Sequence, residues 1–335
     1  MKKRHTTIKD IAKAAGVSTA TVSMILNKKD KNISQPTRER VLKIAKDINY
    51  IPNSMARSLV TSQTKTLGLV LPDIVNPFFP EIARGAEDRA REAGYSIIIC
   101  NTDDNVDQEN KYIQMLSEKM VDGIILTHSA NRNDEMTGLE NSRIPIILID
   151  RDYDSPNVLG KVLVDNSRAS RDGVNYLLKK GYRRIAYIAG PLNTGTARDR
   201  LEGYKIALSE NDIHYDENLV RVGEYRLKWG YEAAEDLLDS KLDFQAIFCG
   251  NDAIAIGAMK KLRERGISVP EDIAIMGFDD IYIASMVDPE LTTIKQPNYS
   301  MGYEAVNMMI DSIQGNKIAN KNLILGTELV VRKSS

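Results

Sequence analysis

Residues 7–27 read TIKDIAKAAGVSTATVSMILN. Thr7 followed three residues later by Asp10 is a capping pattern that begins a helix, and apolar residues then recur at helical spacing. Gly16 favours the end of that helix. Ser18 can cap a second helix that turns its own apolar residues inward. Two short helices joined by a tight glycine turn predict a helix-turn-helix.

A third helix follows at Ser34, where proline in the first turn of Gln35-Pro36 is favourable because a missing N–H costs nothing there. Its apolar stripe consists of Val41, Ile44, Ala45 and Ile48. On the second helix, Thr19, Ala20, Ser23 and Met24 are predicted to point outward. Three helices this short bury little surface. We therefore expect the basic face of this unit to bind DNA, rather than to be merely solvated.

Charge divides the chain into two parts. The 335 residues carry 45 Lys+Arg and 46 Asp+Glu, for a net charge of −1. Residues 1–65 hold 14 basic and 4 acidic residues, a net of +10, which leaves −11 on the remainder. Such asymmetry is typical of nucleic-acid or membrane partners. The 42% apolar fraction excludes a disordered, collagen-like or disulfide-scaffold protein.

From residue 67 onward, short apolar runs alternate with amphipathic helices, a pattern that predicts parallel sheets covered by helices. Because the strands are too many for one such sheet, we expect two doubly wound α/β subdomains with a boundary near 161–166. The expected strands are 67–71, 96–100, 123–126, 146–149, 185–189, 246–249, 273–276 and 329–332. The expected helices are 79–93, 108–119, 167–180, 199–211, 229–240 and 253–266.

Polar residues follow many of these strands at their carboxyl ends, where open α/β sheets bind ligands. Carboxylates, amides and arginines together suit a neutral polyol, whose hydroxyls both donate and accept hydrogen bonds. Aromatic side chains can cover the C–H face of a sugar. For any single Asp or Asn, capping of the following helix is an equally good interpretation. The recurrence over six strands favours a ligand site.

The motifs 7–12, 16–23, 49–53 (NYIPN) and 56–59 (ARSL) resemble the lactose/galactose repressor family, and the likeness runs through the whole chain. The ligand-region motifs are most similar to those of ribose operon repressors. The resemblance implies a helix-turn-helix domain over 1–52, a hinge helix and linker over 53–66, and an effector domain of periplasmic-binding-protein type over 67–335. It places one subdomain at about 67–162 and 295–325, and the other at about 163–294 and 326–335.

The resemblance also implies which residues touch DNA. Thr19, Ala20 and Met24 take the base-reading positions, although Met24 stands where a polar side chain is usual. Ala20 and Met24 can touch a thymine methyl but cannot form strong hydrogen bonds to bases. More of the sequence specificity is therefore expected to come from DNA shape. Leu59 becomes a wedge in the minor groove, although an ordinary core leucine is the alternative. The implied DNA-contact residues are Thr7, Ser18, Thr19, Ala20, Thr21, Ser23, Met24, Asn27, Asn53, Ala56, Arg57 and Leu59.

For the effector, the resemblance implies a sugar, D-ribose, acting as an inducer of a homodimer that binds a pseudo-palindromic operator. His128 stands where a pocket Asn is expected. The implied effector-binding residues are Asn76, Phe78, Phe79, His128, Asp150, Arg151, Arg198, Tyr225, Asn251, Asp279 and Gln296. Aromatic residues among them sandwich the sugar ring, and the others bind its hydroxyls.

No phosphate-binding loop, dinucleotide fingerprint or metal motif occurs, and His5, His128 and His214 lack clear partners by spacing. We therefore expect no enzyme activity, no cofactor and no metal site. The start of the chain is basic without an apolar stretch, and no run is long enough for a membrane span. These features, with Cys100 and Cys249 in apolar runs, predict a cytoplasmic protein with buried thiols and no membrane partner.

Three alternatives remain open. A purine-responsive repressor fits the same scaffold, although the pair Asp150-Arg151 favours a sugar. A global carbon-catabolite regulator that docks a carrier protein is the second, and no surface motif for it is evident. A sugar-binding transport protein is the third, and the basic N-terminal part disfavours it.

Overall fold

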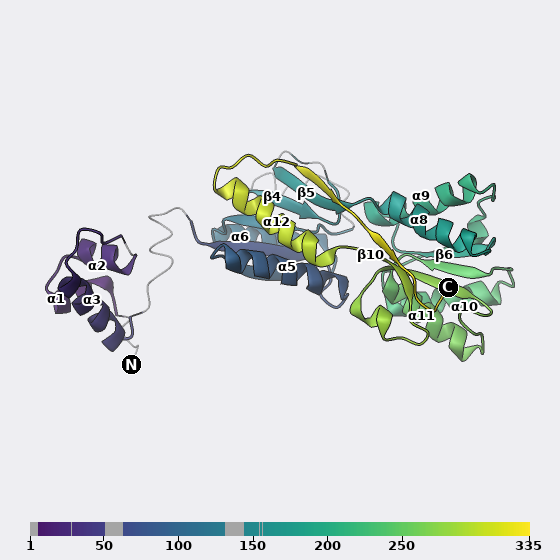
Figure 1. Cartoon of the computed structure of the whole chain (residues 1–335), viewed down its shortest axis with the longest axis horizontal. Coiled ribbons are helices and arrows are strands. Elements are labelled where there is room, and N and C mark those ends of the chain that lie inside the picture. The colour runs from purple at the N-terminus through teal and green to yellow at the C-terminus, as the bar shows by residue number, and fades with distance from the viewer. Residues whose placement is uncertain (1–5, 28, 51–62, 131–143, 154, 156) are drawn as a thin grey trace. The chain divides into compact units, whose positions relative to one another are not determined.

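The computed structural model describes residues 6–27, 29–50, 63–130, 144–153, 155 and 157–335. The chain forms two compact units, 1–64 and 65–335, which are described separately (Figure 1).

The N-terminal unit contains three helices, α1 (Ile8–Ala15), α2 (Thr19–Leu26) and α3 (Gln35–Asp47). The Asp10 carboxylate accepts the N–H and the hydroxyl of Thr7, both at 2.8 Å, so the predicted cap of α1 is present. Gly16 has φ +64°, which a glycine adopts without strain, and it ends α1. Ser18 Oγ accepts the N–H of Thr21 at 3.0 Å and caps α2. The three helices are thus confirmed.

A small apolar core holds these helices together. One residue of the predicted stripe is wrong: Ile48 lies at the C-cap of α3 and is 36% exposed, because the helix ends before it can turn inward. Ser34 does occupy the N-cap position of α3, but its hydroxyl donates to Thr37 Oγ1 at 2.9 Å instead of capping a backbone N–H. The buried residues are Ile11, Ala12, Ala15, Val22, Ile25, Val41 and Ala45.

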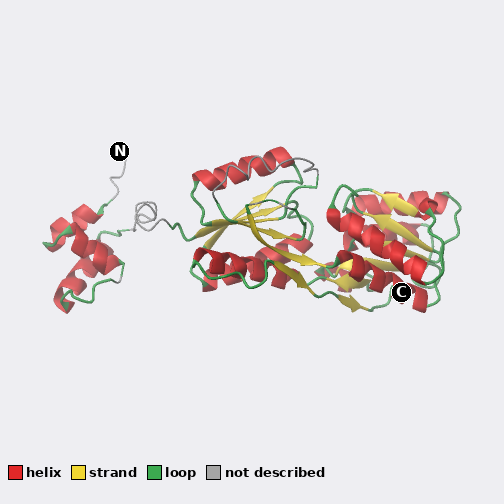
Figure 2. Ribbon diagram, turned by 90° about the horizontal axis from the view of Figure 1, so that it is seen from above, coloured by secondary structure: helices red, strands yellow, loops and turns green. Residues whose placement is uncertain are grey.

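The larger unit contains two six-stranded sheets, which confirms the predicted α/β fold with two doubly wound subdomains (Figure 2). The first has the order β11-β5-β4-β3-β1-β2 and is parallel throughout. Its strands are β1 (Thr66–Leu71), β2 (Ser96–Asn101), β3 (Gly123–Leu126), β4 (Ile146–Ile149), β5 (Val158–Val164) and β11 (Asn322–Leu325).

The second sheet has the order β12-β10-β9-β8-β6-β7 and is parallel except for its edge strand β12. Its strands are β6 (Ile185–Ala189), β7 (Val220–Val222), β8 (Ala246–Cys249), β9 (Ala274–Asp279), β10 (Thr292–Lys295) and β12 (Glu328–Val330). The chain passes between the two sheets after β5, after β10 and after β11.

Helices cover both faces of each sheet (Figure 2). On the first sheet, α5 (Phe78–Glu92) and α12 (Asn298–Ile313) pack on one face, and α6 (Val106–Glu118) packs on the other. On the second sheet, α8 (Asn166–Lys179) and α9 (Gly195–Glu210) share one face. The opposite face is covered by α10 (Leu227–Asp239) and α11 (Asp252–Glu264). Short 3₁₀ turns, η1 (Glu217–Leu219) and η2 (Tyr282–Ser285), follow α9 and β9.

Most predicted elements agree with the structure within two residues, with three exceptions. α9 begins at Gly195 rather than 199, because Thr194 Oγ1 accepts the N–H of Ala197 at 3.2 Å and caps it. β9 continues to Asp279 rather than ending at 276. The predicted boundary at 161–166 begins inside β5, a strand whose Gly160 and Lys161 interrupt its apolar pattern.

No helix among the described residues is long and apolar enough to cross a membrane. Cys100 and Cys249 are buried and not in a disulfide, as predicted.

Candidate functional site

A cavity of about 350 Å³ lies where the carboxyl ends of the strands from both sheets meet. It receives residues that follow β1, β2, β3 and β4 of the first sheet, and residues at or beyond the ends of β6, β7, β8, β9 and β10 of the second. Its lining consists of Pro72, Asp73, Asn76, Phe78, Phe79, Asp103, Asp104, Ala130, Asp150, Arg151, Pro191, Asn193, Thr196, Arg200, Glu224, Tyr225, Arg226, Asn251, Asp279 and Gln296.

The structure brings together nine of the eleven residues predicted for the effector site. They are Asn76, Phe78, Phe79, Asp150, Arg151, Tyr225, Asn251, Asp279 and Gln296. The other two, Arg198 and His128, do not line the cavity.

Arg200, rather than the predicted Arg198, supplies the arginine of this wall. Two positions along a helix correspond to about 200° of rotation, so the two side chains point in opposite directions. Arg198 is exposed and donates from Nη1 to Leu192 O at 2.9 Å. Arg200 is buried, donates from Nε to Asn166 Oδ1 at 2.8 Å and from Nη1 to Gly250 O at 2.6 Å, and stacks 3.7 Å from the ring centre of Phe278.

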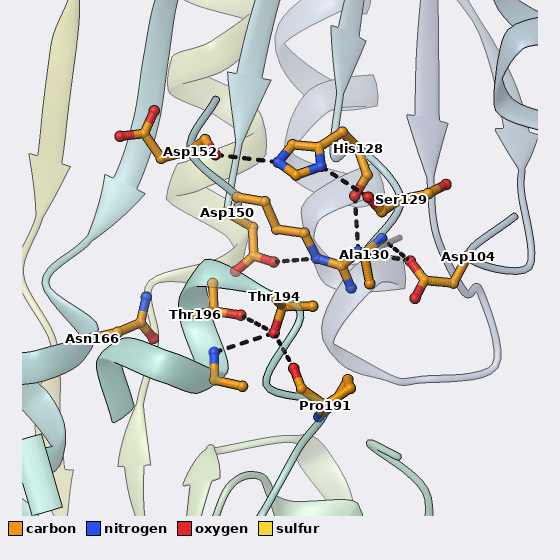
Figure 3. A network of polar contacts seen from close by, with 12 residues as sticks. Asp104, His128, Ser129, Ala130, Asp150, Asp152, Asn166, Pro191, Thr194 and Thr196 are labelled. Atoms are coloured by element: carbon orange, nitrogen blue, oxygen red, sulfur yellow. Dashed lines mark hydrogen bonds and ion pairs between the residues drawn. The ribbon is translucent and has the colours of Figure 1, made fainter. Parts of the chain in front are cut away.

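His128 is buried one layer behind the cavity wall, because the chain turns it away from the ligand space. Its Nδ1 lies 3.0 Å from Ser129 O and its Nε2 lies 3.3 Å from Asp152 O (Figure 3). Burial lowers the pKa of the ring, and the nearby Arg151 charge lowers it further. The backbone carbonyl of His128, and not its ring, contacts a residue of the cavity wall.

Asp150 (Figure 3) and the adjacent Arg151 follow β4 and supply polar groups to the cavity from the first sheet. Arg151 Nη1 donates to Asp104 Oδ1 at 2.7 Å and to His128 O at 2.8 Å, while its Nε lies 4.0 Å from Asp150 Oδ2. Burial raises the pKa of the Asp150 carboxyl, and the nearby Arg151 and Arg200 charges oppose that rise. A ligand hydroxyl that donates to Asp150 would replace the water that burial has removed.

Asp279 and Gln296 form the corresponding contribution of the second sheet. Gln296 Nε2 donates to Asp279 Oδ1 at 2.8 Å, and Arg200 Nη1 lies 3.7 Å from the same oxygen. Burial raises the pKa of Asp279 to about 7, against the opposing effects of Arg200 and Gln296. Gln296 Oε1 is buried without a partner among the described atoms, so it can accept a hydrogen bond from a ligand.

Aromatic side chains border the same space. The rings of Phe78 and Phe79 meet edge to face, with centres 4.9 Å apart. Tyr225 reaches the wall over Gly190, where an added Cβ would lie 2.2 Å from the Tyr225 ring. Only glycine at this position leaves room for the tyrosine. Flat apolar faces beside carboxylates and amides suit the two kinds of surface of a sugar.

Capping and cavity lining coincide in Asn251, the N-cap of α11, whose Oδ1 accepts the N–H of Ile254 at 2.9 Å. Asn76 precedes Pro77, the N-cap residue of α5, and its Oδ1 accepts the N–H of Phe78 at 3.2 Å. Both asparagines line the cavity. A helix cap and a ligand contact are therefore compatible interpretations of one residue.

Sequence reasoning missed several lining residues. Arg200 falls within the predicted helix 199–211 and Thr196 just before it, and neither was among the predicted site residues. Nothing in the sequence around Asp104 indicates a role in the site. Charge is unbalanced across the lining, with six carboxylates and three arginines. The carboxylates are Asp73, Asp103, Asp104, Asp150, Glu224 and Asp279, and the arginines are Arg151, Arg200 and Arg226.

On the N-terminal unit, α2 presents its predicted outward face. Thr19 and Ala20 are exposed, and Met24 is 42% exposed. The other implied DNA contacts at α2 and its ends, Ser18, Thr21, Ser23 and Asn27, are exposed or half-buried. Thr7 is exposed at the start of α1. The remaining predicted DNA contacts, Asn53, Ala56, Arg57 and Leu59, lie outside the described residues.

Models of known protein families match both parts of the chain. Residues 7–53 match the bacterial regulatory proteins of the lacI family, and residues 64–331 match the periplasmic binding proteins and sugar binding domain of the LacI family. The chain belongs to the LacI family of transcriptional regulators, which are DNA-binding proteins and not enzymes.

Three curated relatives are similar over nearly the whole chain. RegA of Clostridium saccharobutylicum is 40% identical, covering 98% of this chain and 99% of the relative. The ribose operon repressor of Halalkalibacterium halodurans is 38% identical, with 98% and 97% covered. The repressor CytR of Escherichia coli K12 is 37% identical, with 100% and 98% covered. The expected particular likeness to ribose operon repressors is thus not singled out.

Solved structures agree on the architecture. The Lac repressor dimer bound to operator and the anti-inducer ONPF is similar with a TM-score of 0.89 at 28% identity, covering 99% of both chains. A CelR–cellobiose complex gives a TM-score of 0.75 at 31% identity, with 99% and 100% covered. A LacI-family regulator of Enterococcus faecium with bound ribose gives 0.72 at 29%, with 81% and 98% covered.

Proposed function

We propose that this chain represses a sugar-utilisation operon as a homodimer, and that D-ribose releases it from the operator. The observation that carries the proposal is the pairing of Asp150-Arg151 on one sheet with Asp279, Gln296 and Arg200 on the other. Each hydroxyl of a pentose both donates and accepts, so it can bridge a carboxylate and an arginine.

The charge of the lining supports an unphosphorylated effector. Six carboxylates against three arginines disfavour an anionic ligand. A purine base needs stacking faces and amide edges, whereas most of the polar side chains that line this cavity are carboxylates and arginines. Two relatives also point to sugars, since one is named a ribose operon repressor and another structure contains ribose.

Release follows from a difference in effector affinity between two states of the dimer. An effector that contacts both subdomains favours the arrangement in which they close on it. In the proposed mechanism, closure of the subdomains on the effector moves the two hinge segments of the dimer apart. Residues 53–59 then no longer bind the minor groove. The residues proposed to contact DNA are those of α2 together with this hinge.

Calorimetric titration tests the effector. D-ribose should bind, and D-xylose, D-glucose and hypoxanthine should bind more weakly or not at all. Binding of hypoxanthine alone would replace the proposal with a purine-responsive repressor. Gel-shift assays on a pseudo-palindromic operator, with and without D-ribose, then give the sign: the sugar should weaken the complex, and a stronger complex would make it a corepressor.

A further inference from the structure

One oxygen of Asp104 joins two loops on the first-sheet side of the cavity. Asp104 Oδ1 accepts a hydrogen bond from Arg151 Nη1 at 2.7 Å and another from the N–H of Ala130 at 2.9 Å (Figure 3). The backbone N–H of Asp104 itself donates to Pro72 O at 2.9 Å. The segments that follow β1, β2, β3 and β4 are therefore connected through this residue, which also lines the cavity.

This arrangement commits one edge of the Arg151 guanidinium to the protein. Nη1 donates to both Asp104 Oδ1 and His128 O, the latter at 2.8 Å, so its two N–H bonds are used. Nη2 forms no hydrogen bond with the described residues, and the buried Nε forms none with them either, although it lies 4.0 Å from Asp150 Oδ2. Because the guanidinium is planar and rigid, fixing Nη1 determines where the remaining donors point.

We propose that Asp104 is a positioning residue that selects the edge of Arg151 presented to the effector. Without the Asp104 carboxylate, the Arg151 side chain is held less firmly and can rotate. The sugar then binds more weakly, because the guanidinium donors no longer have a fixed direction. The proposal rests on the proposed function, since Arg151 is taken to bind the effector. A merely structural role for Asp104 would instead lower stability without dependence on Arg151.

The neighbouring Asp103 offers a matched control. Asp103 and Asp104 have φ +51° and +55°, a conformation that Asn tolerates as well as Asp. Asp103 Oδ1 accepts a hydrogen bond from Asn101 Nδ2 at 2.6 Å and makes no contact with Arg151. Asp103→Asn and Asp104→Asn therefore remove the same charge from the same kind of backbone, and only the second neutralises the carboxylate that forms the ion pair with Arg151.

A double-mutant cycle on the full chain tests the proposal by calorimetry with D-ribose. Asp104→Asn should weaken binding about tenfold, and in an Arg151→Lys background it should add less than about twofold. Asp103→Asn should show no such dependence on Arg151. If the fold losses of affinity in the two single variants multiply in the double variant, Asp104 and Arg151 act independently and the proposal is overturned.

A ligand-free arm separates this proposal from the identity of the effector. The ¹⁵N NMR resonance of Arg151 Nε–H should move in Asp104→Asn and stay in place in Asp103→Asn. If the wild-type chain binds no D-ribose, the proposed effector is wrong, while the NMR comparison still decides whether Asp104 fixes Arg151. An unmoved resonance in Asp104→Asn would overturn the positioning role.

Discussion

Asp150 and Asp279 occupy equivalent places in the two sheets and share an unusual backbone. Asp150 follows β4 and Asp279 ends β9, and each of these strands is third from the same end of its sheet. Their φ angles are +67° and +112°, in the region that favours glycine. Backbone strain of this kind collects at functional sites. Here it places two carboxylates at the cavity, where burial raises the pKa of both and the charge of Asp150 raises that of Asp279 further.

Effector affinity should depend on pH through Asp279. Burial raises the pKa of this carboxyl to about 7 in the effector-free protein. Sugar hydroxyls that donate to Asp279 favour its ionised form, so binding lowers its pKa and releases a proton. Affinity should therefore be highest above pH 7 and fall as the pH drops from 7 toward 5.5.

Calorimetry in two buffers of different ionisation enthalpy measures this proton release directly. Asp279→Asn should bind more weakly and lose most of the pH dependence. Asp216→Asn is a control, since this half-buried carboxylate accepts a hydrogen bond from Asn218 N–H outside the cavity. A pH-independent affinity of the unchanged chain between 5.5 and 8 would contradict the role of Asp279.

Arg200 and Arg198 make a matched pair for testing the cavity wall. Arg200→Met leaves Asn166 Oδ1 and Gly250 O without their donor and leaves Asp279 without its cation. Removing one partner of a buried network destabilises by about 3–5 kcal/mol. Arg198→Met changes an exposed side chain and should stay within about 0.5 kcal/mol. Urea unfolding gives both values, and D-ribose titration should show loss of binding for Arg200→Met alone.

The contrast between these arginines shows what the sequence can predict. Apolar runs that alternate with helices were sufficient for the two-subdomain α/β architecture and for eight of its strands, but β5, β7, β10, β11 and α12 were not predicted. The residues after each strand could be assigned to one edge, because parallel strands share their direction. The start of α9 was placed four residues late, so Arg198 was taken to precede the helix, and the helical rotation that turns Arg200 rather than Arg198 toward the cavity was not considered.

Other parts of the site depend on tertiary contacts that no local pattern records. The roles of Asp104 and of the His128 carbonyl exist only because segments after β2, β3 and β4 meet. β5 was missed because Gly160 and Lys161 break its apolar run, although the strand pairs with β4 and β11 on its two sides. Such features follow from packing between distant segments, and a single sequence carries no signal for them.

Gly190 should control effector affinity through Tyr225. An alanine Cβ at Gly190 would lie 2.2 Å from the Tyr225 ring, so the ring must move away from the cavity wall. We expect Gly190→Ala to weaken sugar binding by about tenfold or more, since overpacking displaces side chains at a cost of about 1–3 kcal/mol. Gly195→Ala is the control, because its Cβ would find only Arg198 Nη2, at 3.9 Å. Equal affinities of the two variants would show that the Tyr225 position is unimportant.

Operator binding should depend on Leu59 and on salt in separable ways. We predict that Leu59→Ala loses most operator affinity, because alanine is too short to insert between stacked base pairs as the proposed wedge does. Its affinity for D-ribose should stay unchanged. The slope of log affinity against log salt should change little, since phosphate contacts by Lys and Arg set that slope. Arg57→Ala should instead lower the slope by about one charge if Arg57 holds a phosphate. Gel shifts over a salt series, with a sugar titration of each variant, measure both quantities. If Leu59→Ala retained full operator affinity, Leu59 would be an ordinary apolar residue and the wedge assignment would be wrong.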